Sequence, residues 1–262
     1  MLFRSLPKHF NYKDTVVKVD GLNTLDTNAY WVKYDGKTWV EHRDPRMPNH
    51  LIDYTMPHKL VRNADFTFTL SIIDYDDILV GDSYTNPLPE FVGNPIKDLF
   101  FVNSRLGILT KNGISLSQQG EFGNFFRTTI LQLLDDSAIA TYIDSNKSVG
   151  LEYATELSTD IILFGDKQQF RLDASKGITP ASISVTNLSG YEINKNVRPI
   201  SHGESVYFVT QRGDYSSLMK MDAATLSTVA KADDISAHIP NYIDGDVIQI
   251  VGSIRNQAIF LK

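Results

Sequence analysis

The sequence predicts a mainly β fold made of antiparallel hairpins in series, of the β-propeller type, with a β-sandwich as the alternative. Aromatic residues make up 11% of the chain, with 14 Phe and 12 Tyr against 2 Trp, and such residues favour strands. Alternation with a period of two and recurring strand–turn–strand units support the same fold class. With 262 residues and 42% hydrophobic content, the chain can fill one large domain or two small ones.

The first predicted hairpin lies in the stretch AYWVKYDGKTWVEH. Its turn is placed at Asp35-Gly36, because an Asp-Gly pair readily supplies the positive φ angles of a tight turn. The clearest single strand is predicted over Asp65–Ile72. A period of two places its four apolar residues on one sheet face, and these are Phe66, Phe68, Leu70 and Ile72.

From about Phe100 onward, a strand, a short polar turn and a returning strand recur in RLGILTKNGISLS, DIILFGDKQQFRLD, SVYFVTQRGDYSSLMKM and DVIQIVGSIRNQAIFLK. The turn centres at Asn112, Lys167, Gly213 and Arg255 are 55, 46 and 42 residues apart. Hairpins repeated at such intervals are typical of propeller blades, which bury both sheet faces only when neighbours stack on them. A sandwich with evenly spaced hairpins fits the same pattern.

Two short helical segments are predicted. Residues Asn124–Leu134 place Phe126, Ile130, Leu133 and Leu134 on one helical face, although the β-branched run Thr128–Ile130 opposes a helix. Asp233–His238 can form a further turn or two, with acidic residues at its start and Pro240 beyond its end.

The stretch Asp74–Pro95 is predicted to be an irregular connection, because it contains Pro87, Pro89 and Pro95 and shows no sustained period. We therefore divide the chain into an N-terminal β-hairpin part over residues 1–80, a connection over 81–95, and propeller-type blades over 96–262.

Composition and motifs argue against several functional classes. With 0 Cys, the chain has no disulfide, thiolate metal site or cysteine nucleophile. A net charge of −6 opposes nucleic-acid binding through a wide basic face, although DNA can still slide past. The sequence contains no GxGxxG, GxxxxGK[ST] or GxSxG motif. No signal peptide or run of eighteen apolar residues is found, so a soluble chain is expected.

Several polar clusters are candidate catalytic or metal-binding sites. They are His42, His50 and His58, the acidic groups Asp74, Asp76, Asp77 and Asp135-Asp136, and the turn Ser201-His202-Gly203-Glu204. No HExxH or HxH motif accompanies the histidines, and the acidic run lacks the glycine and terminal glutamate of an EF-hand loop. We interpret the clusters as locally hydrogen-bonded or solvated side chains. The prediction is that the chain is not an enzyme and has no catalytic, cofactor-binding or metal-binding residues and no cofactor.

Seven stretches in family order resemble the tail tubular protein B, or nozzle protein, family of short-tailed bacteriophages. They span Tyr30–Ile243 and read YWVKYDGKTWVE, TMPHKLVR, PEFVGNPIKDLFFVNSRLGIL, GEFGNFFRTTILQLLDD, LFGDKQQF, VRPISHGESVYFVTQRGDYSSL and DISAHIPNYI. Members of that family are much longer, so the sequence resembles their central section and is interpreted as a fragment or a truncated homologue.

The resemblance implies a structural virion protein of the phage tail, made in the host cytoplasm. It further implies a β-propeller-type domain in a six-fold ring with a central channel for genome ejection. The expected partners are other copies of the chain, a tail adaptor ring protein and a tail fibre, with phage DNA passing without sequence-specific binding and with no membrane insertion.

Within the matched stretches, three groups of residues are predicted to be architectural. Glycines at chain reversals are Gly107, Gly113, Gly120 and Gly123. Rings expected to pack between sheets are Phe100, Phe101, Phe125, Phe126, Phe164, Phe170 and Phe208. Guanidinium groups expected to bridge carboxylates or carbonyls between blades are those of Arg105, Arg127, Arg198 and Arg212, for which DNA contact is the alternative.

A second functional hypothesis is a propeller that binds or cleaves glycan at the host surface. It requires exposed aromatic rings and convergent carboxylates in one pocket. The carboxylates available to it are Asp74, Asp76, Asp77, Asp135 and Asp136.

Overall fold

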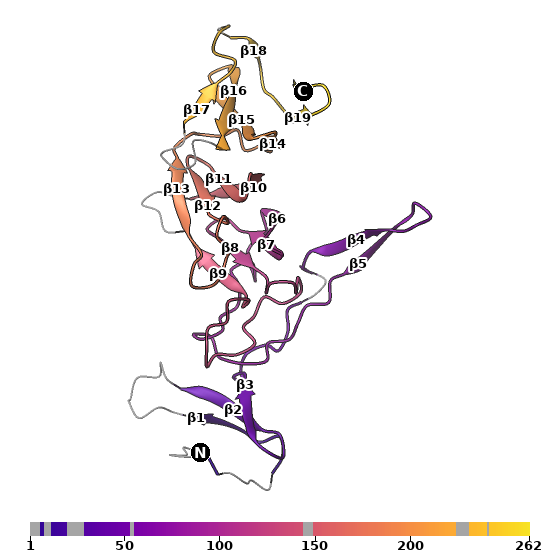
Figure 1. The fold of residues 1–262 in the computed structure, drawn as a ribbon, viewed down its shortest axis with the longest axis vertical. Helices are drawn as coiled ribbons and strands as arrows, with labels where there is room; N and C mark the ends of the chain where they lie inside the picture. Colours follow the sequence, from indigo (N-terminus) through magenta and orange to yellow (C-terminus); the bar gives the residue numbers. More distant parts are fainter. Residues whose placement is uncertain are drawn as a thin grey trace.

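The computed structural model describes residues 6–7, 12–19, 29–52, 55–143, 149–223, 231–239 and 241–262. Over these residues the regular structure consists of antiparallel β-strands and contains no α-helix, which confirms the mainly β prediction. The described residues accordingly contain no helix long and apolar enough to span a membrane. Figure 1 shows the sheets following one another along the long axis, from the N-terminal sheet to the C-terminal strands.

The N-terminal sheet contains β1 (Val16–Val19), β2 (Tyr30–Tyr34) and β3 (Trp39–His42). The predicted Asp35-Gly36 turn joins β2 to β3 and is confirmed. The Asp35 carboxylate accepts hydrogen bonds from the backbone N–H groups of Lys37 and Thr38, both at 2.7 Å, and Gly36 has a φ of 101°. A side chain that replaces backbone partners in this way holds the chain in a tight reversal.

Three larger antiparallel sheets form the body of the molecule. The first contains β6 (Asp98–Val102), β7 (Arg105–Leu109), β8 (Gly113–Leu116) and β9 (Ile139–Tyr142). The second contains β10 (Leu151–Leu157), β11 (Asp160–Gly165), β12 (Gln169–Leu172) and β13 (Val185–Ser189). The third contains β14 (Ile200–His202), β15 (Ser205–Arg212), β16 (Tyr215–Asp222) and β17 (Ala232–Asp234), with β18 (Ile243–Asp244) paired to β16.

A last hairpin, β19 (Ile250–Ser253) with β20 (Ala258–Leu261), follows the third sheet. All four hairpins predicted from the recurring pattern are present, as β7–β8, β11–β12, β15–β16 and β19–β20. Apart from β18, which pairs with β16, strands that are consecutive in sequence are neighbours in each sheet, so local turns determine the order of pairing.

The second body sheet, which lies between the other two, buries both of its faces. Along β11, Ile161 and Leu163 enter the core shared with the first sheet, whereas Ile162 and Phe164 enter the core shared with the third. Because successive side chains point to opposite faces, a strand between two neighbours must be apolar at every position. This explains why DIILFG is buried throughout.

The connection from Asp74 to Pro95 is irregular, as predicted, and no named strand lies between β5 (Phe68–Ile72) and β6. It nevertheless contributes Tyr75, Ile78 and Phe91 to a buried cluster with Leu106 and Ile108 of β7. The connection therefore packs tightly against the first body sheet.

Both predicted helices are wrong. In Asn124–Leu134, the backbone N–H of Phe126 binds the Asn124 side chain at 2.8 Å, and that of Ile130 binds the Glu41 carboxylate at 2.8 Å. Side-chain oxygens thus accept hydrogen bonds from backbone N–H groups that, in a helix, would donate to backbone carbonyls. In the second segment, β17 extends to Asp234, whose carboxylate then accepts from the Ser236 N–H at 3.0 Å and turns the chain.

Candidate assembly surface

A hairpin projects from the middle of the molecule, away from the stacked sheets (Figure 1). We call residues His58–Ile72 the arm; it consists of β4 (His58–Arg62) and β5, joined by a tip at residues 63–67. The strand predicted over Asp65–Ile72 therefore begins three residues later, at Phe68. Asp65 and Phe66 lie in the turn, where Phe66 has a φ of 66°.

One face of the arm is apolar. Leu60 is directly opposite Leu70, and Arg62 is opposite Phe68; at the tip, the Arg62 guanidinium lies over the Phe66 ring at 4.6 Å. The apolar stripe consists of Leu60, Phe66, Phe68, Leu70 and Ile72, which are 63%, 74%, 61%, 67% and 45% exposed. The predicted one-faced alternation is present, but this face is open to solvent.

The other face of the arm is mostly polar. Asn63 donates to the hydroxyls of Thr67 at 3.0 Å and Thr69 at 2.9 Å, and Lys59 pairs with Ser71. The arm is thus amphipathic, although it projects from the body. Because a two-stranded hairpin is marginally stable alone in water, an amphipathic one gains stability when its apolar face is covered.

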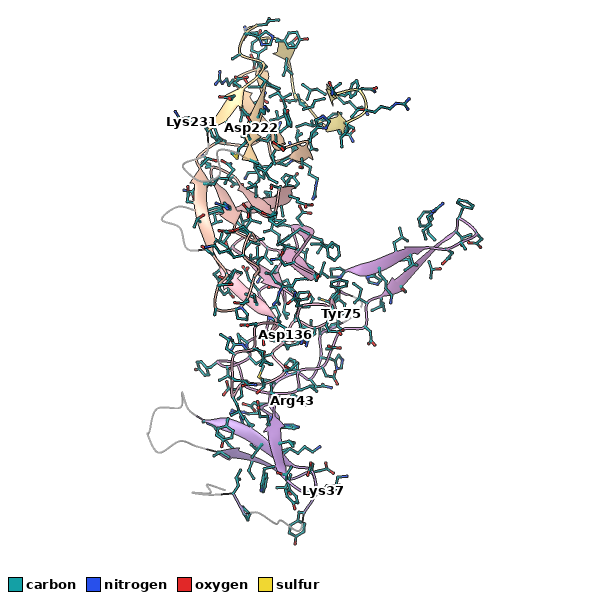
Figure 2. The ribbon with its side chains drawn as sticks, in the orientation of Figure 1. Lys37, Arg43, Tyr75, Asp136, Asp222 and Lys231 are labelled. Carbon is teal, nitrogen blue, oxygen red and sulfur yellow. The ribbon has the colours of Figure 1, made fainter. Side chains whose placement is uncertain are left out.

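An apolar hollow of about 550 Å³ lies at the root of the arm. Its apolar walls include Leu51, Ile52, Met56, Phe91, Val92 and Ile96. The root is anchored beside it, since the buried Tyr75 hydroxyl donates to the Pro57 carbonyl at 2.9 Å. Figure 2 labels Tyr75 where the arm leaves the body.

The acidic group Asp74, Asp76 and Asp77 follows the arm along the chain and lines a second hollow, whose wall also includes Arg127. The Ile78 N–H donates to the Asn49 carbonyl at 2.6 Å, which places Asp77 beside the segment that enters the apolar hollow at Leu51. Partial burial, followed by the charges of Glu121, Asp74 and Asp77, raises the pKa of Asp76. The group is therefore a concentration of negative charge with a preference for a nearby cation.

The five carboxylates considered for glycan chemistry do not share one pocket. Asp74, Asp76 and Asp77 line a shallow hollow with Gln118, whereas Asp136 accepts from the Gln118 amide at 2.9 Å and Asp135 contributes its backbone carbonyl to Arg105. Among the described residues, no group of three His, Asp or Glu side chains is arranged to hold a metal ion.

The histidines make local contacts. His42 and His58 bind the backbone carbonyls of Arg43 and Met56 at 2.7 and 2.8 Å, and His50 lies 4.0 Å from Asp77. The turn predicted over Ser201–Glu204 is shorter in the structure: Ser201 and His202 belong to β14, and only Gly203, with a φ of 63°, and Glu204 form the turn to β15.

Two of the four arginines join parts of the body. Arg105 is fully buried and donates to four backbone carbonyls, those of Ser117, Asp135, Asp136 and Ser137, at 2.7 to 3.1 Å. Burial lowers the pKa of Arg105, partly offset by the charge of Asp136.

Arg198 connects the sheets themselves. It donates to Asp98 of β6 at 2.8 Å and to the Ala154 carbonyl of β10 at 3.4 Å. Asp98 also accepts from the Ala154 N–H at 2.9 Å. Arg198 precedes the third sheet, so this residue fits the predicted bridging role.

The remaining two arginines have lesser roles. Arg212 lies 3.5 Å from Asp234 within one sheet. Arg127 exchanges backbone hydrogen bonds with the side chain of Asn86.

The predictions for the aromatic rings are largely confirmed, with one exception. Phe100, Phe125, Phe126, Phe164, Phe170 and Phe208 are buried. Phe101 is instead 63% exposed and packs edge-on against Phe122, because it lies on the outer face of β6.

The glycines need correction too: only Gly120 of the four adopts a positive φ, of 82°. The other three lie where a side chain would overlap a neighbour, as Gly107 does against the Phe100 ring. Close approach, and not chain reversal, explains them.

Sequence comparison then places this architecture among known proteins. Residues 2–262 match the bacteriophage nozzle protein family. The chain belongs to this family. It is also similar to the tail tubular protein gp12 of Escherichia phage T7, with 34% identity over 241 residues. The match covers 91% of this chain but 30% of the T7 protein, so the chain spans about a third of the length of that relative.

For this nozzle family member, the sequence identified Phe66, Phe68, Leu70 and Ile72 of the apolar stripe, but neither their exposure nor the contribution of Leu60, and the root hollow was missed. The alternation in Phe66–Ile72 is the same signal that a core strand gives. The hollow is built from Leu51, Ile52, Thr55 and Met56 on one side and the segment Phe91–Ile96 on the other, which show no period in the sequence and meet only in three dimensions.

Proposed function

We propose that the chain is a structural, non-catalytic component of the phage tail nozzle and contributes part of the wall around the channel through which the genome leaves. The supporting observation is the family match over residues 2–262. The buried groups of the body connect its sheets, so we assign this body a structural role that depends on shape and contact and not on reactive groups.

The three body sheets are propeller-type blades in this proposal. Each is a meander of four consecutive strands with both faces available for stacking, which is how blades pack. The functional division is the one expected from sequence: an N-terminal part over residues 1–80, a connection over 81–95 and blades over 96–262.

Copies of the chain assemble laterally in the proposed nozzle, as a six-fold ring when the chain is at full length. Contacts of one surface with a different surface close into a ring under rotation. The tail adaptor ring and a tail fibre are the proposed neighbours along the tail. The net charge of −6 disfavours adhesion of phosphate, so duplex DNA passes without being held.

Immunogold electron microscopy of virions of the phage that encodes this chain tests the location. Antibodies raised against the chain are expected to label the distal end of the tail. Label on the capsid, or none on intact and detergent-opened virions, contradicts the proposal. A gel-shift titration with duplex DNA at physiological salt is expected to show no complex, and a tight complex contradicts passive passage.

A further inference from the structure

We propose that the arm is an assembly element: its apolar stripe docks into the root hollow of a second copy of this chain, and Arg62 at its tip pairs with the acidic group beside that hollow. This inference rests on the proposed lateral assembly and adds the surfaces that carry it.

The exposed area favours an interaction with another protein surface. The stripe leaves roughly 600 Å² of mostly apolar surface open, at the upper end of a single patch on a soluble monomer. The whole chain, of 29.4 kDa, exposes 15788 Å², whereas a compact monomer of that mass exposes about 11,500 Å². A standard interface covers about 800 Å² on each partner, so the stripe with its rim has the size of one.

Charge selects another copy as the occupant. The arm carries Lys59 and Arg62 against Asp65, so the chain's net charge of −6 divides into +1 on the arm and −7 on the remainder. The positively charged, apolar arm of one copy is thus complementary to the negatively charged remainder of another copy. Such complementarity both speeds association and determines its register.

The root hollow matches the stripe in chemistry. It is apolar, with a volume of about 550 Å³ that admits the side chains of a hairpin face. Asp77 is the carboxylate beside it, because the Ile78 N–H donates to the Asn49 carbonyl two residues before Leu51. Asp74 and Asp76 line the neighbouring hollow, which also contains Arg127. Arg62 shares the face of the stripe through its pairing with Phe68, so docking the stripe carries this cation toward the acidic group.

The geometry also suits a closed assembly. The stripe and the root hollow are two different surfaces of one chain, and the arm extends away from its own root (Figure 1). The arm of each copy therefore reaches the root of the next. Repetition of such a heterologous contact gives a ring when the rotation closes.

Light scattering of the purified chain over about a hundredfold range of concentration tests the role of the stripe, because association follows mass action. The informative variant is Leu70→Asp. Its control is Thr69→Asp, one residue away on the same exposed strand but on the opposite face. We expect Leu70→Asp to weaken association about tenfold or more and Thr69→Asp to change it by less than about threefold.

Reversing the charges of Arg62 and Asp77 tests whether the tip of the arm docks beside the root hollow. Arg62→Glu is expected to weaken association, and adding Asp77→Lys is expected to restore it at least in part, because the pair is reversed. A photo-crosslinking residue placed at Phe68 is expected to join two chains through the peptide containing residues 91–96, while the same residue at Thr69 is not.

Equal association of the Leu70→Asp and Thr69→Asp variants overturns the inference while leaving tail location and lateral assembly standing. Crosslinks from position 68 that map elsewhere, or remain within one chain, overturn it as well. A wild-type chain that stays monomeric throughout the range also overturns it, whereas the virion labelling described above reports on the proposed function independently.

Discussion

The second body sheet and the arm are both antiparallel β-structures, but their strands differ in pattern and meet opposite environments: β11 is apolar at consecutive positions, and β5 is apolar at alternate positions. In β11, Ile161 to Phe164 are each at most 2% exposed, while in the arm Phe68, Leu70 and Ile72 are 45% to 67% exposed. The sheet has neighbours on both faces, whereas in the described part of the chain the arm has none on its apolar face. Apolar side chains on a strand therefore stabilise the fold in one region and provide a surface for assembly in the other.

The largest expected effect on stability is that of removing the buried guanidinium group of Arg105 in the body. Arg105→Ala removes a donor from four carbonyls, of which that of Asp136 keeps the Gln119 N–H, and opens a cavity. We therefore expect the free energy of unfolding to fall by about 3 to 5 kcal/mol. Arg62→Ala, in the exposed arm, is the matched control and should change it by less than about 0.5 kcal/mol. Urea denaturation followed by far-ultraviolet circular dichroism measures both, because both tryptophans lie in the N-terminal sheet. Equal effects would remove the distinction between the two regions.

Truncating one leucine in each region is the next test. Leu163 is 0% exposed and Leu70 is 67% exposed. Leu163→Ala should cost about 2 to 5 kcal/mol through lost burial and a cavity, whereas Leu70→Ala should cost less than about 0.5 kcal/mol in dilute, unassociated protein. A cost at Leu70 approaching that at Leu163 would mean that the arm folds back onto its own body.

The junction between sheets is expected to give a smaller effect. Arg198→Met removes the cation that binds Asp98 and Ala154, but Asp98 keeps the N–H groups of Leu99 and Ala154. Because the Arg198 side chain is 53% exposed, water and salt reduce the loss to about 1 kcal/mol. Arg212→Met, within one sheet, should have a still smaller effect. Thermal melting at low and high salt compares them, and a larger loss for Arg212 would contradict the bridging role.

The smallest effect concerns pH. The pKa of Asp76 is raised in the folded chain, so its ionised form destabilises the fold; this penalty is absent below the ordinary value of 3.8, grows as pH rises through the raised pKa and is complete at neutral pH. Asp76→Asn should therefore stabilise the chain at pH 7 by less than about 0.5 kcal/mol after solvent screening, and have no effect at low pH.

Asp65 in the arm serves as the control of opposite sign. Hydrogen bonds from the Thr67 hydroxyl and backbone N–H lower the pKa of Asp65. Its ionised form favours the fold above the ordinary value, and this contribution disappears as pH falls through the lowered pKa. Asp65→Asn should thus be destabilising at pH 7. Denaturation curves at several pH values check both signs, and the same sign for the two variants would contradict this assignment.

Much of the secondary structure was accessible from the sequence because it depends on local chemistry. The turn at Asp35-Gly36 and the four later hairpins follow from turn residues between alternating strands. The failed helices, Asn124–Leu134 and Asp233–His238, show the limit of that logic. Their backbone donors go to side chains, including that of Glu41, which is distant in sequence, and local propensity contains no information on such partners.

By itself, then, the sequence determined which segments pair, because a two-residue period and turn chemistry act between neighbours along the chain. It also identified the family, which the match over residues 2–262 confirms. Only the tertiary structure decided which apolar faces are covered. Leu163 and Leu70 both lie on predicted strands, and their burial depends on whether another sheet lies within about 10 Å, a distance set by the packing of distant segments.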